Sequence, residues 1–317
     1  MFRKQTIHNI DFQELCNNAV QWVDNYETIE TELDTFTVIN IPRKGAKGAI
    51  SYILKKIVGA EGFVLKISKK NTKYGNTKMK KHLGKLFEYV SKFEHQDVIV
   101  IPLYAQVINN RLCMVFPLCE AMNKQTKKAL KVKCDDNEKH RKLFQLVQYL
   151  HKGNYVGFDI KVDNLLSCVA GYSMTDYENC ISNIYHDTLP DISVNFNINW
   201  KGVDKALVRQ KFDEYRYYWM ALDYIAFFCM ITRYTFGIGM SIFVTDFVIE
   251  EQQKYINEKR VRGRIDQCAY NILKHVITLL KDPLKVETYD TLQFSMLLGK
   301  RRNAIPIQQR SNSNLKF

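Results

Sequence analysis

Three polar residues stand close together in the middle of the chain, in the stretch Tyr155-Val-Gly-Phe-Asp-Ile-Lys-Val-Asp-Asn-Leu-Leu166. They are Asp159, Lys161 and Asn164. The flanking pattern predicts an apolar strand end, a tight polar turn and a new strand from Leu165, so the three side chains would project from one loop. A carboxylate that orients a hydroxyl, a cation that neutralises charge and an amide that holds a metal are the groups that phosphoryl transfer needs.

The pattern D-x-K-x-x-N-L-L resembles the catalytic loop of protein kinases. The resemblance implies an α+β, bilobal protein-kinase-like fold, with a small antiparallel β lobe and a larger, mainly helical lobe. It also implies ATP and Mg²⁺, and transfer of the γ-phosphate to serine or threonine hydroxyls of proteins. In that reaction Asp159 would orient the nucleophile, Lys161 would steady the γ-phosphate and Asn164 would bind Mg²⁺.

An upstream segment and a lysine fit the same family. In Arg43-Lys-Gly-Ala-Lys-Gly-Ala-Ile50, Gly45 and Gly48 resemble the last two glycines of the phosphate-covering loop G-x-G-x-x-G, and Arg43 takes the first place. Glycines let the backbone approach phosphates, whereas the arginine adds bulk and positive charge. Lys66 matches the family's V-A-I-K lysine, which implies that it holds the α and β phosphates.

Downstream of the loop, Asp176-Tyr-Glu178 comes at the interval where kinases carry D-F-G. The resemblance implies that Asp176 binds Mg²⁺ together with Asn164, and oxygen ligands suit this hard cation. Glu178 replaces the usual glycine. We expect it either to limit switching of the backbone or to add a carboxylate to the metal site, although a solvated turn would explain the same residues.

A helix is predicted between Lys66 and the hinge, from about Thr77 to Phe93, with an apolar face formed by Met79, Leu83, Leu86, Val90 and Phe93. In the family, a glutamate of this helix pairs with the phosphate-binding lysine. Glu88 is the candidate within the helix, although it lies a turn later than the family spacing implies. An exposed helical glutamate explains Glu88 equally well.

A strand pair is expected next, over Val98–Val107 and Arg111–Leu118, around the hairpin signal Asn109-Asn110. The resemblance places the hinge that contacts adenine at Phe116–Cys119, where this strand pair ends. Its expected contacts are Phe116, Pro117 and Leu118, and the bulky Phe116 would close the pocket behind the base.

A second amphipathic helix, Asn137–His151, leads into the catalytic loop. His151 is interpreted as a helix-end residue, because the family's H-R-D reads Gly157-Phe158-Asp159 here. Without the arginine, control through a phosphorylated activation segment is not expected.

The apolar segment Tyr217–Ile231 resembles the buried helix of the family's large lobe. The aspartate that the family carries near the start of this helix falls on Tyr218. Asp223 and Asp213 are the two candidates that could replace it.

The chain of 317 residues, 46% of them hydrophobic, can build one two-lobed domain. Its expected parts are an N-terminal extension (1–36), a small lobe (37–118), a large lobe (119–299) and a basic, flexible tail (300–317). The apolar run Tyr217–Ile249 is broken by charges into pieces too short for a bilayer. Eight cysteines without a C-x-x-C pair predict free thiols in a reducing compartment and no zinc site.

The formal charge of +13 favours acidic partners by electrostatic steering. The pairs D-I-K and D-Y also resemble the casein-kinase-1 and vaccinia-related kinase group, which implies acidic or chromatin-associated protein substrates. No direct nucleic-acid motif is present, no membrane contact is expected, and the oligomeric state is left open. The N-terminus has no apolar signal, so an intracellular, cytoplasmic location is expected, with Lys300-Arg-Arg302 as a weak nuclear signal. The composition would suit a large DNA virus, in which case the host cell is the location.

Two other functions fit the same residues. A small-molecule phosphotransferase of the choline or aminoglycoside kinase type often reads D-[FW]-E where Asp176-Tyr-Glu178 stands, but it generally lacks a lysine at Lys161. A catalytically dead pseudokinase scaffold would explain the missing His-Arg pair and the missing A-P-E motif. Retention of Lys66 and Asp159 disfavours the scaffold.

Overall fold

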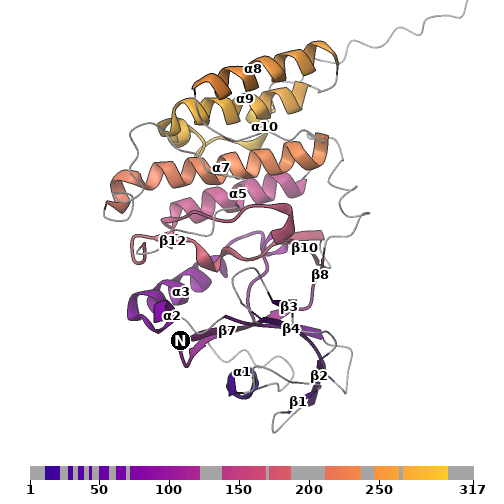
Figure 1. The fold of residues 1–317 in the computed structure, drawn as a ribbon, viewed down its shortest axis with the longest axis vertical. Coiled ribbons are helices and arrows are strands. Elements are labelled where there is room, and N and C mark those ends of the chain that lie inside the picture. Colours follow the sequence, from indigo (N-terminus) through magenta and orange to yellow (C-terminus); the bar gives the residue numbers. More distant parts are fainter. Residues whose placement is uncertain are drawn as a thin grey trace, which may run out of the picture.

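The computed structural model describes twelve stretches of the chain: residues 11–21, 28–30, 35–38, 43–44, 50–56, 62–68, 72–121, 138–168, 171–186, 211–236, 246–263 and 267–298. They form an α+β structure, as the sequence predicts. Strands dominate the first part, which we call the sheet region (residues 11–121). Helices dominate the second, which we call the helical region (residues 138–298). The two lie at opposite ends of an elongated molecule (Figure 1).

A seven-stranded antiparallel sheet forms the sheet region. Its order is β1-β2-β4-β5-β7-β6, and β3 pairs with β4. The strands are β1 (Thr28–Glu30), β2 (Thr35–Val38), β3 (Arg43–Lys44), β4 (Ile50–Lys56), β5 (Gly62–Ile67), β6 (Tyr104–Ile108) and β7 (Arg111–Pro117).

The predicted hairpin at Asn109-Asn110 joins β6 and β7. Both asparagines have positive φ, 48° and 62°, as a tight two-residue turn of this hand requires. The first strand of the pair is shorter than predicted. It begins at Tyr104, because Gln96–Val98 forms a 3₁₀ turn before it.

Alternation along the strands gives the sheet two different faces. In β5, Phe63, Leu65 and Ile67 are buried and pack with the helix α1 (Phe12–Gln21). Lys66 lies between two of them in the sequence and therefore points to the other face. Residues 12–21, expected as part of an N-terminal extension, thus form a core of their own with the sheet.

The opposite face of the sheet belongs to the main core, together with the short helix α2 (Thr72–Gly75) and α3 (Thr77–Val90). Asn76 caps α3, its side chain accepting a hydrogen bond from the backbone N–H of Lys78 at 2.8 Å. The predicted apolar face is confirmed, since all five of its members are buried. They share one core with the helical region, so α3 packs between the two regions.

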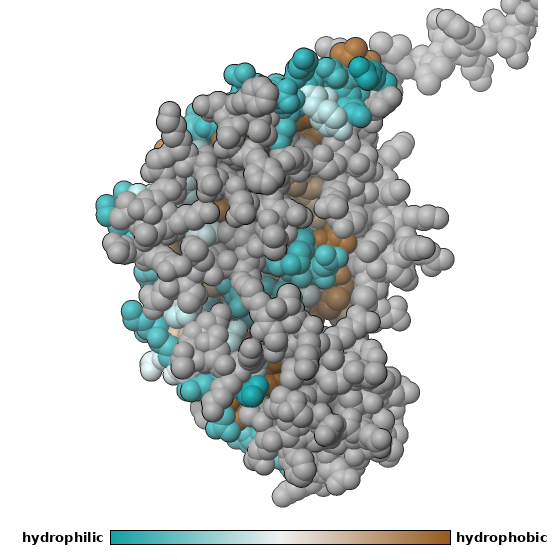
Figure 2. Space-filling model, viewed as in Figure 1, coloured by the Kyte–Doolittle hydropathy of each residue, from teal (hydrophilic) through white to brown (hydrophobic). Residues whose placement is uncertain are grey.

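The helical region stacks α5, α7, α9 and α8 in that order toward the far end of the molecule (Figure 1). Its helices are α5 (Glu138–Lys152), α7 (Phe212–Phe236), α8 (Asp246–Val261), α9 (Gln267–Lys281) and α10 (Phe294–Leu297), with a 3₁₀ helix at Pro283–Thr288. The end formed by α8 and α9 is mostly hydrophilic on the face shown in Figure 2. Within the described residues, no helix is long and apolar enough to cross a membrane.

Two small antiparallel sheets lie between the helices and the large sheet. One has the order β11-β10-β8, from Gly171–Met174, Leu165–Cys168 and Glu120–Ala121. The other pairs β9 (Tyr155–Val156) with β12 (Ile181–Ser182). The predicted strand start at Leu165 is confirmed.

The cysteines divide into two kinds. Cys16, Cys113, Cys180 and Cys229 are free thiols, as predicted, whereas Cys119 and Cys268 are disulfide-bonded. The prediction of free thiols is wrong for these two, because spacing along the chain does not reveal which sulfur atoms approach one another in space.

Candidate active site

The loop between β9 and β10 presents Asp159 and Lys161 on one side. Phe158, Ile160 and Val162 alternate with them and are buried, so the two charged side chains point away from the core. The Lys161 ammonium forms an ion pair with Oδ2 of Asp159. The loop thus holds its cation beside its carboxylate.

Asn164 contacts the same oxygen of this carboxylate. Its amide nitrogen donates to the backbone carbonyl of Asp159 at 2.7 Å and to Oδ2 at 3.3 Å. The second carboxylate oxygen, Oδ1, is buried and accepts no hydrogen bond from any residue that the structure describes. An unpaired buried acceptor costs free energy, and such groups often belong to sites that bind a donor from a ligand.

Asp223 of α7 supports the loop by binding to its backbone. Its carboxylate accepts hydrogen bonds from the backbone N–H groups of Gly157, at 2.9 Å, and Phe158, at 2.7 Å. Gly157 has φ of 79°, a conformation that a side chain disfavours. Of the two candidate aspartates, Asp223 is fully buried at this position, whereas Asp213 is exposed and points into solvent.

His151, in the last turn of α5, lies between two carboxylates. Its Nε2 is 3.1 Å from Asp223 and its Nδ1 is 3.4 Å from Asp290, and the ring meets Tyr224 edge to face at 4.9 Å. Burial alone would lower the pKa of His151, but the two carboxylates outweigh burial and raise it. Burial raises the pKa of Asp223, against the hydrogen bonds that favour its charged form.

The interpretation of His151 as a helix-end residue is therefore confirmed. It omits the contact of His151 with Asp223, which in turn supports the loop. A signal was present in the sequence, because His151 follows Leu150 and lies one turn beyond Val147 on the buried side of the helix. A histidine buried on an apolar face needs a partner, and here the partner supports the loop that carries Asp159.

Lys66 meets two carboxylates on the face of the sheet turned toward the helical region. Its ammonium forms ion pairs with Asp176 and with Glu178. Burial by itself would lower the pKa of Lys66, but the two carboxylates outweigh burial and raise it above its usual range. Lys66 is thus held as a cation on the face of β5 that is turned toward Asp176 and Glu178.

The hairpin of β10 and β11 places Asp176 beside Asn164. Leu165 pairs with Met174, and the N–H of Thr175 donates to the carbonyl of Asn164 at 2.9 Å. Asp176 itself has φ of 63°, which is uncommon for a residue with a side chain. Two segments expected to share a ligand therefore adjoin in space.

Asn164 and Asp176 could hold a metal ion through oxygen. The Asn164 amide uses its nitrogen for Asp159, and its oxygen accepts no hydrogen bond from the described residues. The Asp176 side chain is 42% exposed. The described part of the chain contains no cluster of three or more His, Cys, Asp or Glu side chains that could hold a metal. Two hard oxygen ligands fit Mg²⁺, which binds to few protein groups and keeps waters or phosphate oxygens.

Glu88 is not the partner of Lys66. Its side chain is 66% exposed and its carboxylate accepts a hydrogen bond from Lys92 at 2.8 Å, one turn along α3. The prediction is wrong because Glu88 lies on the outer face of the helix, opposite the apolar stripe that faces the core. The glutamate that contacts Lys66 is Glu178. The sequence predicts for Glu178 a limit on backbone switching, a metal ligand or a solvated turn, and the solvated turn is wrong because its side chain is buried.

The predicted hinge lies at the end of β7. Phe116 is buried, and the N–H of Leu118 donates to the carbonyl of Gly62 at 3.1 Å. Antiparallel pairs alternate between bonded and non-bonded positions, so the carbonyl of Pro117, opposite Phe63, faces away from β5. That carbonyl can accept a hydrogen bond from a ligand. Gly45 and Gly48 lie outside the described residues.

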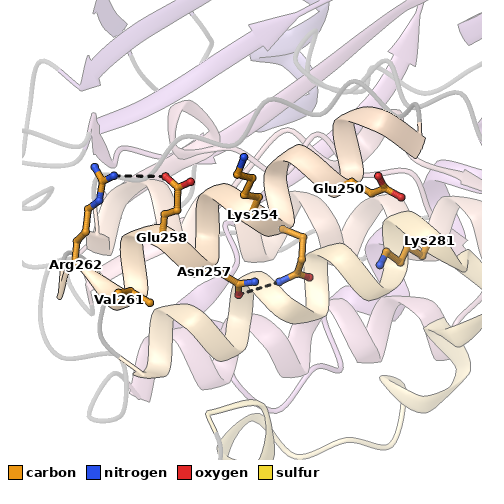
Figure 3. A pocket seen from close by; sticks show the side chains of 8 residues that line it. Glu250, Lys254, Asn257, Glu258, Val261, Arg262 and Lys281 are labelled. Carbon is orange, nitrogen blue, oxygen red and sulfur yellow. Dashed lines mark hydrogen bonds and ion pairs between the residues drawn. The ribbon is translucent and has the colours of Figure 1, made fainter.

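A surface groove of about 690 Å³ runs along α8, away from these residues (Figure 3). Its charges have both signs, and Glu258 lies 3.8 Å from Arg262. It is lined by Glu250, Gln253, Lys254, Asn257, Glu258, Val261, Arg262 and Lys281. None of these side chains is buried, and no acid, base or nucleophile is held in place among them, so the groove is not the candidate active site.

The sequence matches no protein-family model and no curated protein. The functional argument therefore depends on the geometry of this site.

Proposed function

We propose that the protein is an ATP-dependent protein kinase that transfers the γ-phosphate to serine or threonine hydroxyls, and that its two regions are the lobes of a kinase-like fold. One observation carries the proposal: the buried, unpaired Oδ1 of Asp159 lies in a loop whose Asn164 adjoins Asp176, and Asp176 contacts Lys66. A proton acceptor, two oxygen ligands and a phosphate-binding cation are thus assembled from segments far apart in the sequence.

Each residue has a defined task in this reaction. Asp159 accepts the hydrogen bond of the attacking hydroxyl on Oδ1 and so orients it for in-line attack. Lys161, whose ammonium already contacts the other oxygen of Asp159, neutralises charge on the transferred group. Lys66 binds the α and β phosphates, and Pro117 accepts a hydrogen bond from the base at the hinge.

Asn164 and Asp176 would hold Mg²⁺ through the amide oxygen and the carboxylate. When bound there, the ion supplies positive charge that offsets the charge of the phosphates. The two side chains suit this task because one is fixed by its hydrogen bonds to Asp159 and the other is half-exposed to solvent. The charge of +13 supports acidic protein substrates, by steering them to the surface.

The test is incubation of purified protein with γ-labelled ATP, Mg²⁺, an acidic and a basic model protein, and choline. We expect label on serine and threonine of the acidic protein. Asp159→Asn should lower the rate by about 10² or more, because the proton acceptor is lost. Asp163→Asn is the matched control, since Asp163 lies in the same loop but is exposed and points into solvent.

The other outcomes would replace the proposal. Label on choline would identify a small-molecule phosphotransferase. Binding of ATP without any label transfer would identify a pseudokinase scaffold. Equal rates for wild type and Asp159→Asn would remove Asp159 from the reaction.

A further inference from the structure

Lys66 receives both of its carboxylates from one short segment. Asp176 and Glu178 flank Tyr177 at the start of a 3₁₀ helix, Tyr177–Asn179. Tyr177 is fully buried, and its hydroxyl donates to the carbonyl of Val100 at 3.1 Å. This anchor turns the residues on either side of Tyr177 toward β5, which is why both carboxylates reach the same ammonium.

The two carboxylates differ sharply in exposure. The side chain of Asp176 is 42% exposed and that of Glu178 only 4%. Asp176 can leave Lys66 and turn to a ligand on its exposed side, with water filling its place. Glu178 cannot leave without placing a charge in the core, which is costly. Glu178 is therefore the permanent partner of Lys66, and Asp176 is the exchangeable one.

Helix α3 offers Lys66 no carboxylate. Its only acidic residue, Glu88, points to solvent and pairs with Lys92. On the buried side of the helix His82 contacts the segment after Glu178, with Nδ1 2.8 Å from Oγ of Ser182. Helix α3 therefore contacts the chain just beyond the two carboxylates, and among the described residues it gives Lys66 no ion pair.

Helix α3 is also fixed to the helical region. The hydroxyl of Tyr89 donates to the carbonyl of Tyr149 in α5 at 2.9 Å, and the hydroxyl of Tyr149 donates to the carbonyl of Tyr89 at 2.9 Å. The two rings stack with centroids 4.3 Å apart. A swing of α3 would break both hydrogen bonds and the stack, so a movement of this helix is poorly suited to control Lys66.

We propose that Glu178 is the positioning residue that holds Lys66 ready for nucleotide phosphates, so that assembly of this part of the site requires no movement of α3. The inference rests on the proposed function. It adds that the position of Lys66 is not controlled by a movement of α3. With Glu178 in place, Asp176 is free to bind Mg²⁺. Without Glu178, Asp176 becomes the sole partner of Lys66 and competes with the ion.

The experiment compares Glu178→Gln with Glu88→Gln, two isosteric changes that each remove one carboxylate. For Glu178→Gln we expect the KM for ATP, and the Mg²⁺ concentration that gives half-maximal activity, to rise about tenfold, as loss of a charge-assisted hydrogen bond implies. Excess Mg²⁺ should restore much of the activity that this variant loses at ordinary Mg²⁺ concentration. Glu88→Gln should match wild type in both, and Glu178→Asp, which keeps the charge, should fall between.

A binding measurement accompanies the kinetics. The rise in melting temperature caused by ATP, measured with and without Mg²⁺, should shrink in Glu178→Gln and stay at the wild-type value in Glu88→Gln. A purely structural role of Glu178 would lower the melting temperature without ligand and leave the ATP-induced rise and the Mg²⁺ requirement unchanged. That result would overturn the inference.

The inference and the proposed function fail in different ways. Wild type that transfers phosphate while Glu178→Gln keeps the wild-type KM and Mg²⁺ requirement overturns the inference alone. Wild type that transfers no phosphate overturns the proposed function, and the ATP-induced rise then still decides whether Glu178 positions Lys66 for nucleotide. A tenfold rise of KM in Glu88→Gln would return the role to α3.

Discussion

The two halves of the site are held in opposite ways. The loop of Asp159 is supported by fully buried groups, since Asp223 binds two backbone N–H groups of the loop and His151 binds Asp223. Lys66 is instead supported by Asp176 and Glu178, which belong to a different segment of the chain. One half is fixed by buried hydrogen bonds, and the other by two ion pairs, one to a buried carboxylate and one to a half-exposed carboxylate.

The difference fits the proposed function. A residue that orients a nucleophile needs a fixed position, and buried hydrogen bonds without exchange with water provide it. A residue that receives phosphates must exchange partners when the nucleotide enters, and a half-exposed carboxylate such as Asp176 permits that. Substitutions in the buried support should therefore change stability and activity together, whereas those around Lys66 should change binding of nucleotide first.

The largest expected effect is that of Asp223→Ala. It leaves two backbone N–H groups of the loop and the ring of His151 without their acceptor, and we expect a loss of about 3–5 kcal/mol in the free energy of unfolding, with transfer lost as well. Chemical denaturation measures the free energy of unfolding, and the label assay measures the transfer of phosphate. Asp213→Ala in the first turn of the same helix is the control and should change neither. Equal behaviour of the two variants would show that the loop has no support from α7.

His151→Gln tests the same support through pH. The pKa of His151 is raised above its ordinary value of 6.5, so the imidazolium stabilises the fold fully below pH 6.5, and this contribution is lost as the pH rises through the folded value. The pKa of Asp223 is also raised, from an ordinary value of 3.8. The contribution of Asp223 to the stability of the fold is therefore lost as the pH rises above 3.8, at lower pH than that of His151.

The variant should be less stable than wild type by about 2 kcal/mol at low pH, where the imidazolium forms charge-assisted hydrogen bonds. The difference should shrink as the pH rises above 6.5. Denaturation curves at matched pH values measure it. A difference that is independent of pH would mean that His151 is neutral throughout.

Gly157→Ala tests whether the backbone of the loop is as constrained as its hydrogen bonds suggest. At φ of 79° a Cβ is strained, and we expect a loss of about 1–2 kcal/mol together with slower transfer, because the loop shifts from Asp223. Gly84→Ala in α3 is the opposite case, since an added Cβ there meets no atom within 4 Å. That variant should gain about 0.5–1 kcal/mol from helix propensity. A loss of stability in both variants would show that the effect of Gly157→Ala does not depend on the positive φ of Gly157.

The smallest effect is expected for Tyr89→Phe. One hydrogen bond between α3 and α5 is lost, at a cost of about 1 kcal/mol, while the ring stack remains. Thermal denaturation measures it. Because the support of Lys66 does not involve α3, the KM for ATP should stay at the wild-type value, and a clear rise would connect the helix to the nucleotide site.

Much of the local structure could be predicted from the chain. The apolar stripe of α3 repeats at helical spacing, and the paired asparagines of the β6–β7 turn need no distant contact to adopt positive φ. The loop of Asp159 was predicted for the same reason, because an apolar strand end, a polar turn and a new strand from Leu165 follow one another within a few positions. Local patterns such as these are decided by neighbours in the sequence.

The pairing of charges could not be predicted in the same way. Glu88 and Glu178 were both available to Lys66, and Asp213 and Asp223 were both available to the loop. In each case the residue that makes the contact is the buried one, and the unused one faces solvent. Burial of a given helical position depends on what packs against it, and that partner comes from a distant part of the chain.

The sequence by itself determined which chemical groups the chain carries and how they are spaced within each segment, from the Asp159 loop to the apolar face of α3. Only the tertiary structure decided that Glu178 holds Lys66 and that Asp223, with His151, supports the loop. The physical reason is that the strength of an ion pair or a hydrogen bond depends on distance and on exclusion of water. Both are set by the packing of segments that lie far apart along the chain.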